Sequence, residues 1–193
     1  MGTWKTRGLR GSTLENLINL SNDIYRSKKI ALVQKIPTPI TPMEIDKTTR
    51  HITLAYFDKQ STVDYIGAVQ GIPVCFDAKE CASDTFPLAN IHPHQVAFMK
   101  DFEEQSGISF FMINFTGREE VYLLPFRDLY RFWIRMEEGG RKSFQYAEMN
   151  RKFLVRQSRD VPLHYLEQLD RYLQEIDSLD GAQTTGGTGE SCD

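Results

Sequence analysis

Apolar residues recur at the spacing of an amphipathic helix in four parts of the chain. In the first part, Ser12 is placed to act as N-cap and Glu15 follows three residues later, which is the pattern of a capping box. In the second, Pro93 stands in the first turn and Gly107 at the C-terminal end. We therefore expect helices over four ranges: 12–28, 92–107, 127–138 and 162–176.

Runs of β character lie between these helices. The run 108–115 (ISFFMINF) is almost entirely apolar, as expected for a strand that is buried within a sheet. Two shorter runs flank Gly71, and no internal repeat is visible. The alternation of strands and helices favours an α/β fold. We expect strands over 29–36, 108–115, 119–126 and the two runs around Gly71.

The segment 37–60 breaks the pattern. It begins with three prolines and continues through threonine, isoleucine and aromatic residues that favour extended structure. We interpret 37–60 as an excursion from the core. A surface loop is the alternative, given the length of the segment.

Length and composition favour one domain. With 193 residues, 40% of them hydrophobic, the chain suits one compact core better than two. We expect a single domain over 1–176 and a flexible tail over 177–193, whose Gly, Thr and Ser content disfavours folding. Three cysteines without a CxxC pair indicate a reducing compartment. No apolar run has the length of a signal peptide or membrane span, so we expect a cytoplasmic protein without a membrane partner.

The net charge of −3 understates how basic the folded part is. The tail 177–193 holds four acidic residues and no Lys or Arg, so the rest has 26 − 4 = 22 acidic against 23 basic residues. Local basic clusters, such as Lys5, Arg7 and Arg10, are therefore compatible with binding to phosphates. Any one of these clusters is, by itself, more typical of an ordinary solvated surface.

One hairpin combines two carboxylates with an amine. A two-residue loop at Gln70 and Gly71 would pair residues whose numbers sum to 141, and Asp64 and Asp77 satisfy that sum. Their Cβ atoms would then lie roughly 4.5–5.5 Å apart on one face of the hairpin. Strand alternation places Lys79 beside Asp77 on the same face. The pattern predicts that three charged groups converge.

Two carboxylates at this separation repel each other unless one is protonated or a cation lies between them. Mg²⁺ prefers oxygen ligands and carries water that can be activated for hydrolysis. A D-x-K triplet is nevertheless common and usually has no catalytic role, and a bulge at Pro73 would shift the register. The residues alone leave both interpretations open.

Four stretches, read together, resemble the RecU family of bacterial Holliday junction resolvases: RGSTLENLINLSNDIY, STVDYIGAVQGIPVCFDAKE, FPLANIHPHQ and GRKSF. The resemblance runs in order from about Arg10 to the last helix. It implies a restriction-endonuclease-like α/β fold, with a mixed central β-sheet flanked by helices and a stalk that projects at about 37–60. It also implies a Mg²⁺-dependent phosphodiesterase, with Mn²⁺ as the alternative metal.

The resemblance further implies roles for individual residues. Thr62, Asp64, Asp77 and Gln95 would form the metal site, and Lys79 would stabilise the reacting phosphate or orient the attacking water. The family usually has Glu where this chain has Asp77, so the side chain here is one methylene shorter. The spacing from Asp77 to Gln95 is also one residue shorter than we expect of the family.

Two further sets of residues follow from the same resemblance. Glu15 occupies the position of the family's helix-one glutamate and is a candidate catalytic residue, although its capping box explains it equally well. Contacts to DNA are expected from four residues: Arg10, Lys47, Arg50 and His51.

The function implied is the resolution of four-way DNA junctions by paired symmetrical nicks during recombination and repair. Paired nicks require a homodimer, because two active sites must be related by a two-fold axis. Recombinase and branch-migration proteins are expected partners. Two alternatives remain: a nuclease that cuts simple duplexes, and a junction-binding recombination accessory protein with weak or no catalysis.

Overall fold

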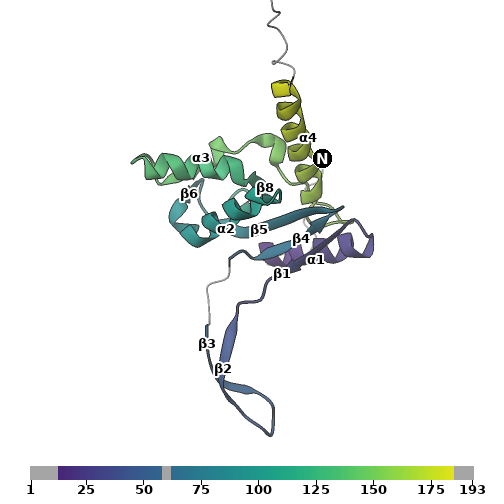
Figure 1. The fold of residues 1–193 in the computed structure, drawn as a ribbon, viewed down its shortest axis with the longest axis vertical. Coiled ribbons are helices and arrows are strands. Elements are labelled where there is room, and N and C mark those ends of the chain that lie inside the picture. The colour runs from purple at the N-terminus through teal and green to yellow at the C-terminus, as the bar shows by residue number, and fades with distance from the viewer. Residues whose placement is uncertain (1–12, 58–61, 185–193) are drawn as a thin grey trace, which may run out of the picture.

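The structure is a computed structural model that describes residues 13–57 and 62–184 (Figure 1). Along the chain, its helices and strands are α1 (Leu14–Ser27), β1 (Ala31–Lys35), β2 (Ile40–Ile45), β3 (Ile52–Phe57), β4 (Tyr65–Val69), β5 (Ile72–Cys81), β6 (Thr85–Pro87), η1 (Leu88–Asn90), α2 (Pro93–Glu104), β7 (Ile108–Phe115), β8 (Glu120–Pro125), α3 (Phe126–Glu137), β9 (Ser143–Gln145), η2 (Tyr146–Glu148), η3 (Arg151–Phe153) and α4 (Tyr165–Thr184).

A five-stranded mixed sheet forms the centre of the molecule, with strand order β1-β4-β5-β7-β8. Neighbouring strands are antiparallel except for β5 and β7, which run parallel. The apolar strand β7 lies between two other strands, as its sequence predicts. The expected α/β fold with a mixed central sheet flanked by helices is confirmed.

Each face of the sheet packs against its own pair of helices. Phe76 points to the face covered by α1 and α4, where its ring stacks on Tyr65 at 4.7 Å and on Phe110 at 4.6 Å between centroids. Cys75 points to the opposite face, in the cluster formed with α2 and α3. Because side chains alternate along a strand, Asp77 and Lys79 share the face of Cys75.

The hairpin of β4 and β5 has the register that the sequence predicts. Residue numbers of every β4–β5 pair sum to 141, from Tyr65 opposite Phe76 to Val69 opposite Ile72. Pro73 sits opposite Ala68 without shifting this register. No bulge therefore displaces the residues that follow.

Two residues with positive φ make the turn of this hairpin. Gln70 has φ 49° and Gly71 has φ 91°, values that fit the type I′ turn favoured by two-residue loops. A second glycine, Gly67 on β4, permits the close approach of β1, since a Cβ there would lie 2.1 Å from the carbonyl oxygen of Leu32. Both glycines help to hold β4 between β1 and β5.

Strands β2 and β3 form a separate two-stranded sheet that projects from the body (Figure 1). Their pairing begins with Ile40 opposite Phe57 and ends with Ile45 opposite Ile52. We call the residues 40–57 the stalk. Its large apolar side chains are unusually exposed: Ile40, Met43, Ile45, Ile52, Leu54, Tyr56 and Phe57.

Two expected boundaries differ from the structure. Helix α1 is capped by Thr13, whose hydroxyl accepts a hydrogen bond from the Asn16 N–H at 3.4 Å, while Ser12 lies outside the described residues. Glu15 makes no capping box but pairs with Lys35 on β1. At the other end, α4 continues to Thr184, past the expected start of the tail at 177, because extending an established helix costs little. No helix in the described part is long and apolar enough to cross a membrane.

Candidate active site

Asp77 and Lys79 on β5 form the centre of the site. The Asp77 side chain is completely buried, and its Oδ1 lies 2.8 Å from Nζ of Lys79. The Lys79 side chain remains 20% exposed, so its ammonium group can be reached from solvent. An ammonium group that contacts a buried carboxylate and is also open to solvent is well placed to bind an anionic ligand.

Asp64, the residue just before β4, joins this pair. It lies one step before the Tyr65–Phe76 pair, so continuing the register would bring it opposite Asp77. Its Oδ2 accepts a hydrogen bond from the Ala78 N–H at 3.0 Å, which holds the carboxylate against β5. The convergence of two carboxylates and one amine, predicted from the hairpin, is confirmed.

Burial raises the pKa of Asp77 to about 7, because the charged form loses its hydration. The Lys79 ammonium opposes this shift, whereas the charge of Asp64 and a hydrogen bond with Asp64 add to it. Asp77 Oδ1 has the Lys79 ammonium beside it at 2.8 Å, and no other described residue donates to it. An ionised carboxylate oxygen with a single partner keeps a lone pair that can bind a cation.

Gln95, in the first turn of α2, fixes the other oxygen of Asp77. Its side chain is 5% exposed, its Nε2 donates to Asp77 Oδ2, and its Oε1 accepts the His92 N–H at 3.1 Å. The second bond fixes the orientation of the amide. Gln95 therefore presents an NH₂ group to Asp77, and an NH₂ group is a donor rather than a metal ligand.

The other expected site residues make no contact with Asp77 that the structure shows. Thr62 is exposed two residues before Asp64, and its hydroxyl makes no hydrogen bond to a described residue. Glu15 is bound to Lys35 on the surface instead of contacting Asp77. Arg10 lies outside the described residues. The structure brings together four of the expected site residues: Asp64, Asp77, Lys79 and Gln95.

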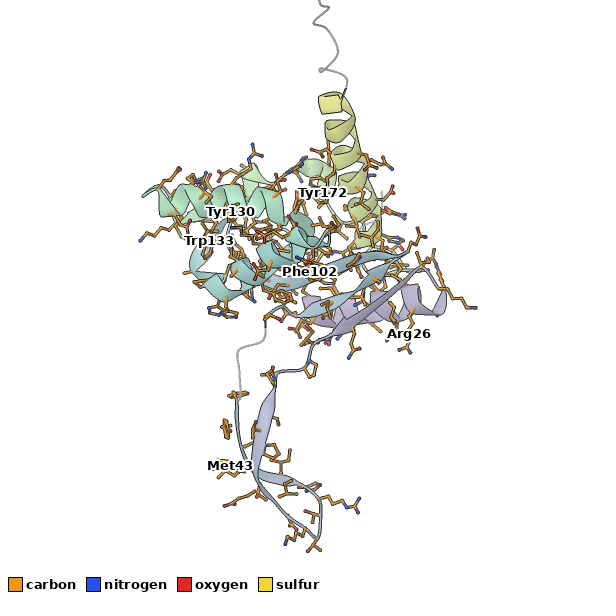
Figure 2. All side chains as sticks on the ribbon, viewed as in Figure 1. Arg26, Met43, Phe102, Tyr130, Trp133 and Tyr172 are labelled. Atoms are coloured by element: carbon orange, nitrogen blue, oxygen red, sulfur yellow. The ribbon has the colours of Figure 1, made fainter. Side chains whose placement is uncertain are left out.

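The expected DNA-binding residues of the stalk lie together at its tip. Lys47, Arg50 and His51 are exposed in the loop between β2 and β3. Figure 2 shows side chains, Met43 among them, extending from both strands of the hairpin into open space. The basic tip and the carboxylate site are therefore separate features of the molecule.

Glu80 is a residue near the site whose role the sequence did not reveal. Its Oε1 accepts the Leu14 N–H at the start of α1 at 2.7 Å and lies 3.5 Å from Asn114 Nδ2. The first N–H groups of a helix lack partners within the helix, and a carboxylate satisfies them well. Strand alternation predicts that Glu80 points to the face opposite Asp77 and Lys79. Nothing in the sequence indicates that its partner is the Leu14 N–H.

The site offers two of the carboxylate ligands that a divalent cation prefers, Asp64 and Asp77. Across 13–57 and 62–184, no group of three or more His, Cys, Asp or Glu side chains could hold a metal ion. Two adjacent carboxylates nevertheless fit a hard cation that retains several waters, because Oδ1 of Asp77 has only Lys79 as a partner among the described residues. Such a cation would also relieve the repulsion that helps to raise the pKa of Asp77.

A mixed sheet with two carboxylates and a lysine on adjacent strands at its centre defines an α/β protein of the restriction-endonuclease-like class. The family model described as Recombination protein U matches residues 9–171. The chain belongs to the RecU family.

Several similar proteins are named Holliday junction resolvase RecU. The protein from Leuconostoc mesenteroides subsp. mesenteroides is 40% identical over 174 residues, which cover 88% of this chain and 84% of that protein. The protein from Oceanobacillus iheyensis is 41% identical over 88% of this chain and 86% of its own length. The protein from Geobacillus kaustophilus is 37% identical, with coverages of 88% and 84%. Each of these relatives therefore matches most of this chain.

Proposed function

We propose that this protein is a metal-dependent endonuclease that resolves four-way DNA junctions by paired symmetrical nicks. The observation that carries the proposal is the convergence of Asp64, Asp77 and Lys79 on one face of adjacent strands. Relatives named as Holliday junction resolvases support the choice of substrate. The protein would act in the cytoplasm in recombination and repair.

Asp64 and Asp77 would hold the divalent cation, with Oδ1 of Asp77, which lies beside Lys79, as one ligand. Membership of the RecU family implies a divalent metal, and we propose Mg²⁺, with Mn²⁺ as its substitute. When bound, the metal supplies an acidified water and neutralises charge on the phosphate. Thr62 remains a proposed ligand, whereas Gln95 supports the site by orienting Asp77.

Lys79 would contact the phosphate during cleavage. Its ammonium group already lies beside the buried carboxylate and reaches solvent, so it can neutralise negative charge that develops on the phosphate oxygens. It can also orient the attacking water by hydrogen bonding. Glu15 pairs with Lys35 on the surface, and a catalytic role for it at the start of α1 stays a proposal.

The stalk would bind the open centre of the junction. Lys47, Arg50 and His51 at its tip are exposed and can contact phosphates, which positions a protein on DNA without reading sequence. Arg10, which precedes α1 in the sequence, is proposed as a further phosphate contact. Recognition of this kind reads the shape of the junction.

A homodimer would supply the second active site. The sheet face over β1 and β4 that carries Leu32 and Ile66 is exposed, at 59% and 36%, and continues toward the apolar stalk. Exposed apolar surfaces of this kind commonly mark interfaces. We propose that a second copy covers this face of β1 and β4. Recombinase and branch-migration proteins would then bind the assembled dimer.

Cleavage of two labelled substrates tests the proposal. A mobile four-way junction and a linear duplex are each incubated with the protein in Mg²⁺ and in chelator. We expect paired symmetrical nicks in the junction alone, and only with Mg²⁺. Equal cutting of both substrates would indicate a duplex nuclease. A junction that is bound but uncut would indicate a binding protein, for which the shorter side chain of Asp77 gives a reason.

A further inference from the structure

The stalk is less basic than a DNA-binding projection should be. Its residues 40–57 include two positive residues, Lys47 and Arg50, and two negative residues, Glu44 and Asp46. Negative charge close to phosphates weakens binding, so an acid directly beside Lys47 requires a reason.

Asp46 makes four hydrogen bonds that close the tip. Its Oδ1 accepts the N–H groups of Thr48 at 2.7 Å and Thr49 at 3.1 Å. Its backbone oxygen accepts the Arg50 N–H at 2.8 Å, and its own N–H donates to the His51 carbonyl at 2.9 Å. One residue therefore binds four others, which include two of the expected DNA contacts.

These hydrogen bonds stabilise the backbone conformation of the tip. Arg50 has φ 59°, in the left-handed region that an arginine rarely adopts unless surrounding contacts require it. The two N–H groups bound to Asp46 also lower its pKa, so its carboxylate is ionised when it accepts them. The other acid of the stalk differs: Glu44 is exposed and makes no hydrogen bond or ion pair with a described residue.

We propose that Asp46 is a positioning residue that fixes the shape of the stalk tip, so that Lys47 and Arg50 are presented to the phosphates of a four-way junction. The inference rests on the proposed function of the stalk. A loop that is already ordered loses less conformational entropy when it binds. A fixed spacing of two cations also lets the tip distinguish a junction by its shape.

Three substitutions separate the effect of the Asp46 hydrogen bonds from the effect of its negative charge. Asp46→Ala removes the charge and the hydrogen bonds, Asp46→Asn removes the charge but keeps an oxygen acceptor, and Glu44→Ala removes a neighbouring charge that forms no bonds. We expect Asp46→Ala to weaken junction binding by about five- to tenfold, since the tip must then be ordered on binding. Asp46→Asn and Glu44→Ala should bind as tightly as the unchanged protein, or more tightly.

Two further measurements distinguish positioning from general damage. Asp46→Ala should raise KM for the junction while kcat stays unchanged, and should leave the affinity for a linear duplex unchanged. Amide hydrogen exchange at Thr48 and Thr49 should accelerate in Asp46→Ala and not in Glu44→Ala.

The inference is overturned if Asp46→Ala binds the junction as tightly as Glu44→Ala does, or if Asp46→Asn is as weak as Asp46→Ala. The doubly substituted Lys47→Ala, Arg50→Ala protein tests the premise separately. If that protein also binds the junction normally, the stalk is not the junction contact, and the proposed role of the stalk fails together with the inference. If it binds weakly while Asp46→Ala does not, only the role of Asp46 is wrong.

Discussion

The body and the stalk are made of the same kinds of residues but are held together in different ways. In the body, Phe76 is fully buried between Tyr65 and Phe110, on the sheet face covered by α1 and α4. In the stalk, Phe57 is 76% exposed on a two-stranded sheet. A two-stranded hairpin is marginally stable in water unless something packs on it.

This difference separates chemistry from recognition. Buried surroundings raise the pKa of Asp77 and hold its oxygens in place, which a reactive site requires. The stalk has no core, so local hydrogen bonds at Asp46 and contacts with DNA or a second copy must order it. Substitutions in the two regions should therefore have different consequences.

Loss of a carboxylate in the body should have the largest effect. Asp64→Ala removes one proposed metal ligand, and we expect the rate of junction cleavage to fall by about 10³-fold or more. Junction affinity, measured by gel mobility shift in the presence of Ca²⁺, should stay within about twofold, because the basic stalk tip is intact.

The exposed Asp101→Asn on α2 is the matched control and should cleave normally. If Asp64→Ala loses junction binding together with cleavage, Asp64 has a structural role and the division between body and stalk fails.

The same substitution in the two regions should have contrasting effects on stability. Phe76→Ala removes a buried, doubly stacked ring and should lower the free energy of unfolding by about 3–5 kcal/mol. Phe57→Ala should change it by less than about 0.5 kcal/mol, as for most exposed positions. Urea unfolding followed by circular dichroism measures both. A concentration-dependent loss of several kcal/mol for Phe57→Ala would instead place the stalk inside a dimer interface.

The raised pKa of Asp77 predicts how stability depends on pH without metal. The folded protein keeps a proton on Asp77 between about pH 4 and 7 that the unfolded chain has lost, so the free energy of unfolding falls as pH rises through this range. Asp77→Asn has no carboxyl group to ionise, so its stability does not fall for this reason as pH rises. In chelator it should be more stable than the unchanged protein by about 1–3 kcal/mol at pH 8 and nearly equal at pH 4.

Unfolding in urea at pH 4, 6 and 8 measures this difference. A constant difference between the two proteins across the range would show that Asp77 keeps its charge in the folded state.

The smallest effect should come from single charges of the stalk. Lys47→Ala should weaken junction binding by about five- to tenfold and reduce the slope of log K against log salt by about one unit, which is the signature of one lost phosphate contact. Fluorescence anisotropy across a series of salt concentrations measures the slope. An unchanged slope would mean that Lys47 points away from DNA, whatever the shape of the tip.

The sequence predicted those features that local rules decide. The turn at Gln70 and Gly71 determines the register, so the position of Asp64 opposite Asp77 follows from counting residues along the chain. Strand alternation places Lys79 beside Asp77 in the same way. The buried position of β7 follows from its apolar run.

Features that depend on contacts between distant residues could not be predicted. Glu80 supplies an oxygen to the start of α1 from 66 residues away. Gln95 was expected to bind metal, yet its amide is oriented by the His92 N–H so that it donates to Asp77. Spacing along the chain can predict that a residue lies near a site. Its role in the site depends on its hydrogen bonds, which the spacing does not give.

A Mn²⁺ ion located in a crystal would test the cleavage site most directly. Crystals soaked in MnCl₂ should show an anomalous peak in contact with Asp64 and with Oδ1 of Asp77, and Asp64→Ala crystals should lack it. Absence of a peak beside these carboxylates at saturating Mn²⁺, or a peak bound only by other residues, would contradict the account.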